Sequence, residues 1–131
     1  MRQVENSPPP SVLVVEDQFL IRMITVDVIE DAGFRVYAAD RADEAIRMLE
    51  QRGDIGFVFT DIEMPGSMDG LALARRVGDR WPDIRVIVTS GGGQTSRMNL
   101  PPGGIFIAKP YSLETLVAKL RATLAEPVPV H

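Results

Sequence analysis

Four short, mostly apolar runs of the sequence end in side chains that can bind a metal ion or a phosphoryl group. Those side chains are Glu16, Asp17, Asp61, Ser90 and Lys109. Runs of aliphatic and aromatic residues without alternation are typical of strands that are buried on both faces of a parallel sheet. The carboxyl ends of such strands lie together, and open α/β sheets bind their ligands there. We therefore expect these five side chains to lie close to one another.

The three carboxylates favour a magnesium-dependent phosphoryl acceptor. Glu16, Asp17 and Asp61 would repel one another, and each negative charge tends to raise the pKa of a neighbouring carboxyl group. A hard divalent cation relieves that repulsion, and Mg²⁺ fits because the chain has no cysteine and a single histidine to recruit zinc. Lys109 would add a positive charge and Ser90 a hydroxyl donor. Such groups are typical of a nucleophilic aspartate that accepts a phosphoryl group.

Each of these residues also has a purely structural interpretation. Asp61 alone could end a turn or cap a helix, and Glu16-Asp17 could cap the helix that follows and complement its dipole. Lys109 could be a solvated loop residue, and Ser90 could be a hydroxyl that ends a strand. We favour the functional interpretation because all of them fall at the same predicted end of one sheet.

The composition limits the classes of function. The chain of 131 residues has the size of one domain, and no apolar run approaches the ~20 residues of a membrane span. Its net charge of −4 opposes the phosphate-neutralising surface that nucleic-acid binding needs. The absence of cysteine suits a reducing compartment. We therefore expect a cytoplasmic protein with no direct contact to nucleic acid or membrane.

Strand and helix patterns alternate along the chain. Strands are predicted over residues 12–15, 34–39, 57–60, 84–90 and 105–108, and helices from Gln18 and after the capping residues Asp40, Asp69 and Ser112. In the first helix Ile21, Ile24, Val28 and Ala32 fall on one face, which we expect to be buried. Units of this length predict an α/β fold, a doubly wound five-stranded parallel sheet with helices on both faces.

Three segments are predicted to be less regular. Residues 91–104 hold five glycines and two prolines, and glycine costs ~1 kcal/mol per helical position. We expect at most two helical turns there, or a loop, so the fourth helix should be short or irregular. Residues 1–10 should form a flexible N-terminal arm, residues 11–126 the folded domain and residues 127–131 a C-terminal tail.

Taken together, these motifs resemble the receiver domain of two-component response regulators, over about residues 11–126. The matching pieces are Val14-Val15-Glu16-Asp17, Asp61-Ile62-Glu63-Met64-Pro65, Asp69-Gly70-Leu71, Val86-Ile87-Val88-Thr89-Ser90-Gly91 and Phe106-Ile107-Ala108-Lys109-Pro110. Any one piece is weak, but the five in order, at compatible spacing, make a specific match. The resemblance implies the flavodoxin-like strand order 2-1-3-4-5.

The resemblance also implies roles for the charged residues. Asp61 would be the phosphoacceptor and, with Asp17, a direct ligand of Mg²⁺. The backbone carbonyl of Glu63 would be a third ligand, and Glu16 would act mainly through water. Lys109 would contact the phosphoryl group. The phosphodonor would be a histidine kinase or a histidine phosphotransfer protein, and the output would pass to a downstream protein target.

Two positions of the resemblance concern switching. Thr89 and Ser90 compete for the hydroxyl position, and alignment of the strand favours Ser90, since Thr89 would then point to the opposite face. Phe106 occupies the family's aromatic switch position but lacks the hydroxyl of the tyrosine common there. The loop of residues 64–70 has one residue more between its proline and its aspartate than the commonest form, so a wider loop is expected.

Three functions are compatible with these patterns. The first is a stand-alone receiver that acts through another protein, because the chain ends soon after its last predicted helix. The second is an aspartyl-phosphate phosphatase of the haloacid dehalogenase type, but those enzymes place a DxD nucleophile after the first strand, and Ile62-Glu63 gives no DxD. The third is a pseudo-receiver that serves as an interaction module. The complete set of charged residues favours the receiver, which is no enzyme beyond its own phosphorylation and hydrolysis.

Overall fold

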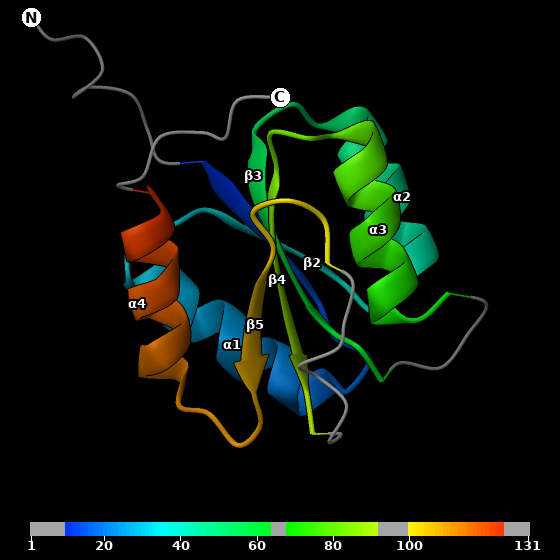
Figure 1. Cartoon of the computed structure of the whole chain (residues 1–131). Coiled ribbons are helices and arrows are strands. Elements are labelled where there is room, and N and C mark those ends of the chain that lie inside the picture. The colour runs from blue at the N-terminus through cyan, green and yellow to red at the C-terminus, as the bar shows by residue number, and fades with distance from the viewer. Residues whose placement is uncertain (1–9, 64–67, 92–99, 125–131) are drawn as a thin grey trace, which may run out of the picture.

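Strands and helices alternate along the computed structural model, which describes residues 10–63, 68–91 and 100–124 (Figure 1). In chain order the elements are β1 (Ser11–Val15), α1 (Phe19–Asp31), β2 (Val36–Ala39), α2 (Ala42–Gln51), β3 (Ile55–Asp61), α3 (Gly70–Arg80), β4 (Arg85–Ser90), β5 (Ile105–Ala108) and α4 (Leu113–Leu124). Within these ranges no helix is long and apolar enough to cross a membrane.

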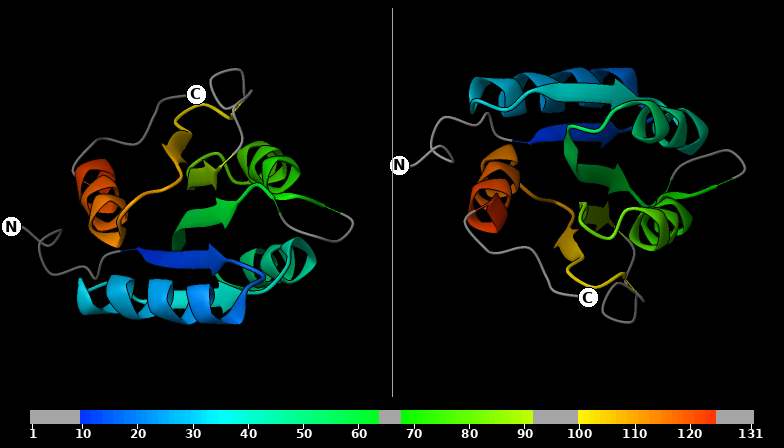
Figure 2. Two further views of the ribbon diagram at one scale, coloured as in Figure 1. Left: turned by 90° about the horizontal axis from the view of Figure 1, so that it is seen from below. Right: turned by 90° about the horizontal axis from the view of Figure 1, so that it is seen from above.

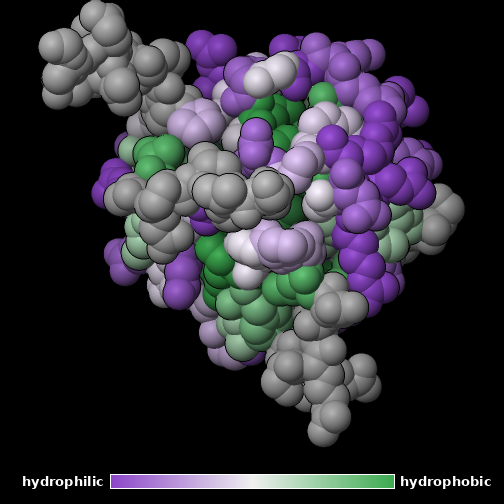
Figure 3. Space-filling model, turned by 45° about the horizontal axis from the view of Figure 1, so that its top comes forward, coloured by the Kyte–Doolittle hydropathy of each residue, from purple (hydrophilic) through white to green (hydrophobic). Residues whose placement is uncertain are grey.

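The five strands form one parallel sheet in the order β2-β1-β3-β4-β5, so the predicted fold class and strand order are confirmed. Helices α1 and α4 cover one face of the sheet, and α2 and α3 cover the other (Figures 1 and 2). Hydrophilic side chains gather on the side of the molecule formed by α2 and α3 (Figure 3). Because all strands run the same way, the sheet has a carboxyl end, where they finish, and an amino end, where they start.

The core consists of two apolar layers, one on each face of the sheet. Alternate residues of the central strands supply them: Leu13 and Val15 pack toward α2 and α3, whereas Val12 and Val14 pack toward α1 and α4. None of these four side chains is more than 1% exposed. The uninterrupted apolar run of β1 is therefore explained by burial on both faces. Because packing on both faces fixes the position of the strand, it also fixes where the residues directly after the strand leave the sheet.

The start of α3 packs directly against the end of β3. Asp69 caps α3 as predicted, since its side chain accepts a hydrogen bond from the Ala72 N–H at 2.9 Å. The Gly70 N–H donates to the Ile62 carbonyl at 3.0 Å. A Cβ at position 70 would lie 2.0 Å from the carbonyl oxygen of Asp61, so a larger residue would displace the backbone.

The buried face of α1 differs from the prediction. Ile21 and Ile24 are 42% and 53% exposed, and Thr25 and Ile29 are buried in their place. The helix carries apolar residues on most of its sides, so hydrophobic periodicity does not distinguish its faces. The buried Thr25 hydroxyl is satisfied because it donates to the Ile21 carbonyl at 2.7 Å.

The predicted caps of the other helices are partly confirmed. Asp40 does not cap α2, because the cap position is Arg41 and the Asp40 N–H donates to the Glu44 side chain at 3.1 Å. Ser112 does cap α4, since its hydroxyl accepts a hydrogen bond from the Thr115 N–H at 3.1 Å. A single acidic residue before a helix therefore locates the start of the helix better than the cap itself.

Several predicted segments lie wholly or largely outside the described residues. They are the N-terminal arm except for Pro10, the C-terminal tail, most of the loop of residues 64–70 and most of residues 91–104. Of the last segment, residue 91 and residues 100–104 are described, and residues 100–104 contain a turn and no helix. Among the described residues the helix that comes last along the chain is α4.

Candidate functional site

Asp61 is the last residue of β3, and both of its carboxylate oxygens are engaged. The side chain is buried, with 5% of the residue exposed. Its Oδ2 accepts a hydrogen bond from the Lys109 ammonium at 2.6 Å, and its Oδ1 accepts one from the Glu63 N–H at 3.0 Å. A buried carboxylate needs such partners, because an unpaired buried charge is strongly destabilising. The carboxylate is therefore held in one orientation at the carboxyl end of the sheet.

Lys109 follows β5 and supplies the positive charge beside Asp61. Burial of the ammonium group opposes its charged form, but the hydrogen bond and charge of Asp61 and the charges of Glu63 and Glu16 outweigh burial. Together they raise the pKa of Lys109 above its ordinary value. Lys109 therefore stays protonated across the neutral pH range.

Glu16 and Asp17 follow β1 at the same end of the sheet. Glu16 is 8% exposed, and its carboxylate accepts a hydrogen bond from the Gln18 N–H at 3.1 Å. Burial raises the pKa of Glu16, and the hydrogen bond from Gln18 lowers it. The nearby carboxylates of Asp61 and Asp17 raise it further, so that the pKa is above its ordinary value. The negative charges that the sequence predicts at one place are thus close enough to act on each other.

Ser90 ends β4 and contacts the site, whereas Thr89 does not. Ser90 is 3% exposed, and its hydroxyl donates a hydrogen bond to the Glu63 carboxylate. That hydrogen bond has the largest effect on the pKa of Glu63, which it lowers. Burial raises the same pKa by a smaller amount, so the pKa lies below its ordinary value. The Thr89 hydroxyl is buried and has no hydrogen-bond partner in the described part of the chain. No sequence pattern predicts that the Glu63 side chain binds Ser90.

Phe106 lies on β5 in register with Val88 and is half-buried. Its ring packs against the apolar layer that faces α2 and α3. The structure therefore brings Glu16, Asp61 and Lys109 together and places the predicted switch residue Phe106 in the packed layer next to them.

Backbone hydrogen bonds tie the strand ends together at the level of the site. The Ile62 N–H donates to the Thr89 carbonyl at 2.9 Å, and the Lys109 N–H donates to the Ser90 carbonyl at 3.1 Å. The ends of β3, β4 and β5 are thus linked just where the reactive side chains leave the sheet.

The donor groups around Asp61 fit Mg²⁺. The predicted metal ligands, which are carboxylates and the Glu63 carbonyl, supply only oxygen atoms. The main chain of Glu63 lies beside Asp61 because the Glu63 N–H donates a hydrogen bond to the Asp61 carboxylate. Among the described residues no group of three or more acidic or histidine side chains is arranged to hold a metal ion. A magnesium site here would therefore need backbone carbonyls and waters beside one or two carboxylates, which is how proteins commonly bind Mg²⁺. Burial is the main cause of the raised pKa of Glu16, and the negative charges of Asp61 and Asp17, which a cation would relieve, add to it.

Tyr111 is a residue of the site that sequence reasoning missed. It lines a cavity of about 490 Å³ together with Lys109 and Glu16. Burial, followed by the charges of Glu16 and Asp61, raises the pKa of Tyr111 to about 12. The available signal was an aromatic residue directly after Lys109-Pro110. By itself that signal does not distinguish a core aromatic from the wall of a site.

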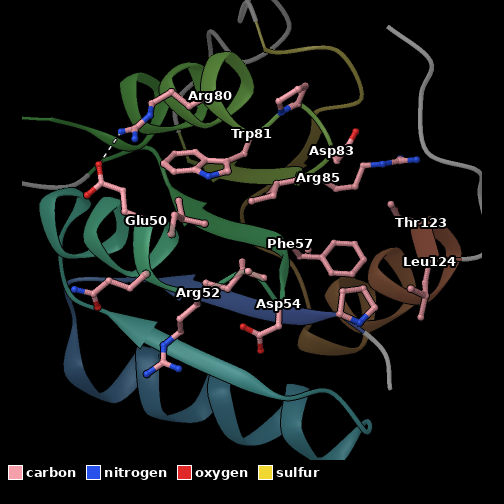
Figure 4. A pocket seen from close by; sticks show the side chains of 18 residues that line it. Glu50, Arg52, Asp54, Phe57, Arg80, Trp81, Asp83, Arg85, Thr123 and Leu124 are labelled. Carbon is pink, nitrogen blue, oxygen red and sulfur yellow. Dashed lines mark hydrogen bonds and ion pairs between the residues drawn. The ribbon is translucent and has the colours of Figure 1, made fainter. Parts of the chain in front are cut away.

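A larger cavity of about 770 Å³ lies at the amino end of the sheet (Figure 4). Trp81, Arg85 and Leu124 are among the side chains around it, and none of the predicted site residues lines it. Two of its charged groups, Arg80 and Glu50, form a partly exposed ion pair at 3.0 Å (Figure 4). We therefore place the candidate site at the carboxyl end, where the buried carboxylates gather.

The chain resembles proteins of one family in sequence. A sequence model described as the response regulator receiver domain matches residues 12–121. The sensor kinase CckA of Brucella abortus is 34% identical over 127 residues, which cover 94% of this chain and 13% of the kinase. The response regulator receiver protein CpdR of the same organism is 29% identical over 86% of this chain and 95% of its own length.

Solved structures give the same result. The crystal structure of a response regulator receiver protein from Sinorhizobium medicae matches with a TM-score of 0.78 and 26% identity, over 88% of this chain and 94% of that one. The chain covers 13%, 25% and 24% of the length of three curated relatives, CckA being the first, and 95% of CpdR. Sequence and structure thus point to one family.

Proposed function

Because the chain belongs to the response regulator receiver domain family, we propose that it accepts a phosphoryl group on Asp61 from a histidine kinase or a histidine phosphotransfer protein. The observation that carries this proposal is the buried Asp61 carboxylate, paired with Lys109 at 2.6 Å at the carboxyl end of the sheet. We assign residues 11–126 to the receiver domain. The chain would modify only itself and would not turn over other substrates.

The reaction needs one nucleophile and two donors from the chain. A carboxylate oxygen of Asp61 forms the new bond to phosphorus, and the bond from phosphorus to the donor's leaving group breaks. Lys109 keeps its proton because its pKa is raised, so it can bind an oxygen of the transferring group. The Ser90 hydroxyl can donate to a second oxygen once it turns away from Glu63.

The magnesium ligands in this proposal are the side chains of Asp17 and Asp61 and the backbone carbonyl of Glu63, with Glu16 acting through water. When bound, Mg²⁺ supplies positive charge that offsets the negative charge of the phosphoryl oxygens arriving at a carboxylate. The carboxylates that hold the ion, directly or through water, act in their charged form, so the raised pKa of Glu16 should weaken metal binding as pH falls.

Ser90 and Phe106 would couple phosphorylation to a protein-binding surface. In this structure the Ser90 hydroxyl donates a hydrogen bond to the Glu63 carboxylate, and the half-buried Phe106 ring packs against the core. Turning the hydroxyl toward a phosphoryl oxygen changes the space next to Phe106, and an inward movement of the ring would alter the surface around β5. A downstream protein that binds one arrangement better shifts the equilibrium toward it.

The test is the intact mass of the protein after incubation with Mg²⁺ and acetyl phosphate. We expect one phosphoryl adduct that is stable in acid and labile in base. Asp61→Asn should give no adduct. Asp54→Asn, a matched change at the amino end of the sheet, should give the same adduct as the unchanged chain.

Three outcomes would contradict the proposal. An adduct that persists in Asp61→Asn would place the phosphoryl group elsewhere. No adduct on the unchanged chain, together with no binding of beryllofluoride, would favour an interaction module that works without phosphorylation. Turnover of p-nitrophenyl phosphate would show an enzyme acting on other substrates.

A further inference from the structure

The cavity beside Asp61 and Lys109 has walls of mixed chemistry. Its volume is about 490 Å³, and its walls are formed by Glu16 after β1, Ile21 on α1, and Lys109, Pro110 and Tyr111 after β5. Asp61 itself does not line the cavity, but Lys109, which does, donates a hydrogen bond to the Asp61 carboxylate. A group placed there would lie one side chain away from the acceptor carboxylate.

Tyr111 is held in one position in this wall. Its ring meets the ring of Phe59 edge to face, with centroids 6.1 Å apart and an interplanar angle of 87°. Phe59 lies two residues before Asp61 on β3, so both side chains leave the strand on the same face. The ring also packs against the apolar layer that faces α1 and α4. The packing of the acceptor strand thus fixes Tyr111.

The hydroxyl of Tyr111 is not explained by this packing. A phenylalanine would make the same edge-to-face contact with Phe59. Among the described residues the hydroxyl has no hydrogen-bond partner, although it lies in the field of the Glu16 and Asp61 carboxylates. Burial and those charges raise the pKa of Tyr111 to about 12, so the group keeps its proton and remains a hydrogen-bond donor.

We propose that Tyr111 is a specificity-determining residue of the phosphoryl-transfer site, whose hydroxyl donates a hydrogen bond to the leaving group of an acyl phosphate seated in this cavity. The inference rests on the proposed function, since it takes Asp61 as the nucleophile. An acyl phosphate releases a carboxylate, and Glu16 in the same wall would repel that charge. Lys109 in the same wall is engaged with Asp61 and is assigned to a phosphoryl oxygen. Neither Ile21 nor Pro110 has a side-chain donor, so the Tyr111 hydroxyl is the donor that remains in the wall for the leaving oxygen.

The step balances without any further reactant. A carboxylate oxygen of Asp61 forms a bond to phosphorus, and the bond between phosphorus and the acyl oxygen breaks. The carboxylate leaves with the electron pair of that bond. No proton is transferred, so the Tyr111 hydroxyl acts only as a hydrogen-bond donor to the oxygen on which negative charge develops.

The experiment compares two small phosphodonors on Tyr111→Phe and on the unchanged chain. With acetyl phosphate, removal of one hydrogen bond in the transition state should slow adduct formation by about three- to tenfold. With phosphoramidate the rate should change by less than about twofold, because the leaving nitrogen already carries its hydrogens and offers the hydroxyl no lone pair. The ratio of the two rates, measured on one sample, does not depend on the fraction of folded protein.

Tyr37→Phe is the matched control, because it removes a hydroxyl that bonds Asp54 at 2.8 Å away from the site. It should leave both rates unchanged. An equal loss with both donors in Tyr111→Phe, or no loss with either, would overturn the inference while leaving Asp61 as the acceptor. If the unchanged chain accepts a phosphoryl group from neither donor, the proposed function itself is wrong, and the inference is wrong with it.

Discussion

The carboxyl and amino ends of the sheet both carry charged side chains, but in different surroundings. At the carboxyl end Asp61 and Glu16 are only 5% and 8% exposed, and a hydrogen-bonded ion pair joins Asp61 to Lys109. At the amino end the Asp54 side chain is 41% exposed and accepts hydrogen bonds from the Ser11 and Tyr37 hydroxyls at 2.7 and 2.8 Å. The carboxyl end therefore buries two carboxylates near each other, whereas the amino end leaves the Asp54 carboxylate partly exposed and hydrogen-bonded to two hydroxyl groups.

This difference indicates what marks a reactive site in the molecule. The amino end has the larger cavity, about 770 Å³ against about 490 Å³. Its ion pair between Arg80 and Glu50 is partly exposed, and such pairs contribute little to stability. At the carboxyl end burial and like charges raise the pKa of Glu16, an arrangement that stability alone would not favour. In this molecule, buried carboxylates that lie near one another identify the candidate site better than the volume of a cavity does.

Removal of the Lys109 ammonium group should have the largest effect, and it acts on the rate of phosphorylation. We expect Lys109→Ala to slow phosphorylation of Asp61 by acetyl phosphate about 10²- to 10³-fold, the usual effect of losing one preorganised donor to developing charge. Arg80→Ala, which removes a cation at the amino end, should leave the rate unchanged. The measurement is the rate of adduct formation by mass. Equal effects of the two substitutions would remove the distinction between the ends.

The close contact between α3 and β3 should have the next largest effect. Gly70→Ala should lower the free energy of unfolding by about 1–3 kcal/mol, because the new Cβ would collide with the Asp61 carbonyl. Gly53→Ala near the amino end has nothing within 4 Å of its Cβ and should be neutral or slightly stabilising. Urea unfolding measures both. A neutral Gly70→Ala would mean that the backbone at Asp61 yields easily.

The unpaired hydroxyl of Thr89 gives a smaller effect of opposite sign. Thr89→Val keeps the shape of the side chain and removes a buried hydroxyl without a partner in the described residues, so stability should rise by about 1 kcal/mol. Ser11→Ala removes a hydroxyl that bonds Asp54 and should lower stability by a similar amount. Thermal unfolding of the two variants should therefore shift in opposite directions, and a destabilised Thr89→Val would show that the hydroxyl is bonded.

The smallest effect is a pH dependence that should differ in sign between the two ends. The pKa of Glu16 is raised in the fold, chiefly by burial, so its contribution to stability is lost as pH rises through that pKa. Without divalent metal, Glu16→Gln should be the more stable protein at neutral pH. Hydrogen bonds from Ser11 and Tyr37 lower the pKa of Asp54, so its contribution is lost as pH falls.

Urea unfolding in EDTA at several pH values measures these slopes. Asp54→Asn should be less stable than the unchanged chain at neutral pH, and this difference should shrink in acid. The difference for Glu16→Gln should also shrink in acid, but from the opposite sign. Slopes of the same sign in the two variants would contradict the assignment of buried charge to the carboxyl end alone.

Much of the site could be predicted from the sequence because its position follows from strand ends. The apolar runs before Glu16 and Asp61 are buried on both faces, and parallel strands finish together. These two facts are sufficient to bring Glu16, Asp61, Ser90 and Lys109 to the same end of the sheet. Predicting the strand order also required the family resemblance, because the apolar runs of the sequence do not show which strands are neighbours in the sheet.

Features that depend on side-chain geometry could not be predicted in the same way. The exposed side of α1 was assigned wrongly because Ile21, Ile24 and Ile29 are equally apolar, and only packing decides which is buried. The bond from Ser90 to the Glu63 carboxylate depends on the path of the loop after β3. Tyr111 reads as an ordinary core aromatic until the cavity beside it is seen.

The backbone bonds that join Ile62 to Thr89 and Lys109 to Ser90 have a consequence for timing. They prevent the strand ends from separating, so a change at Asp61 begins with rotation of side chains on a fixed frame. Rotations of exposed side chains take picoseconds to nanoseconds, whereas Asp61 and Ser90 are buried, so their rotation also requires neighbouring side chains to move. The duration of the signal would then follow the survival time of the phosphoryl group wherever that repacking is the faster process.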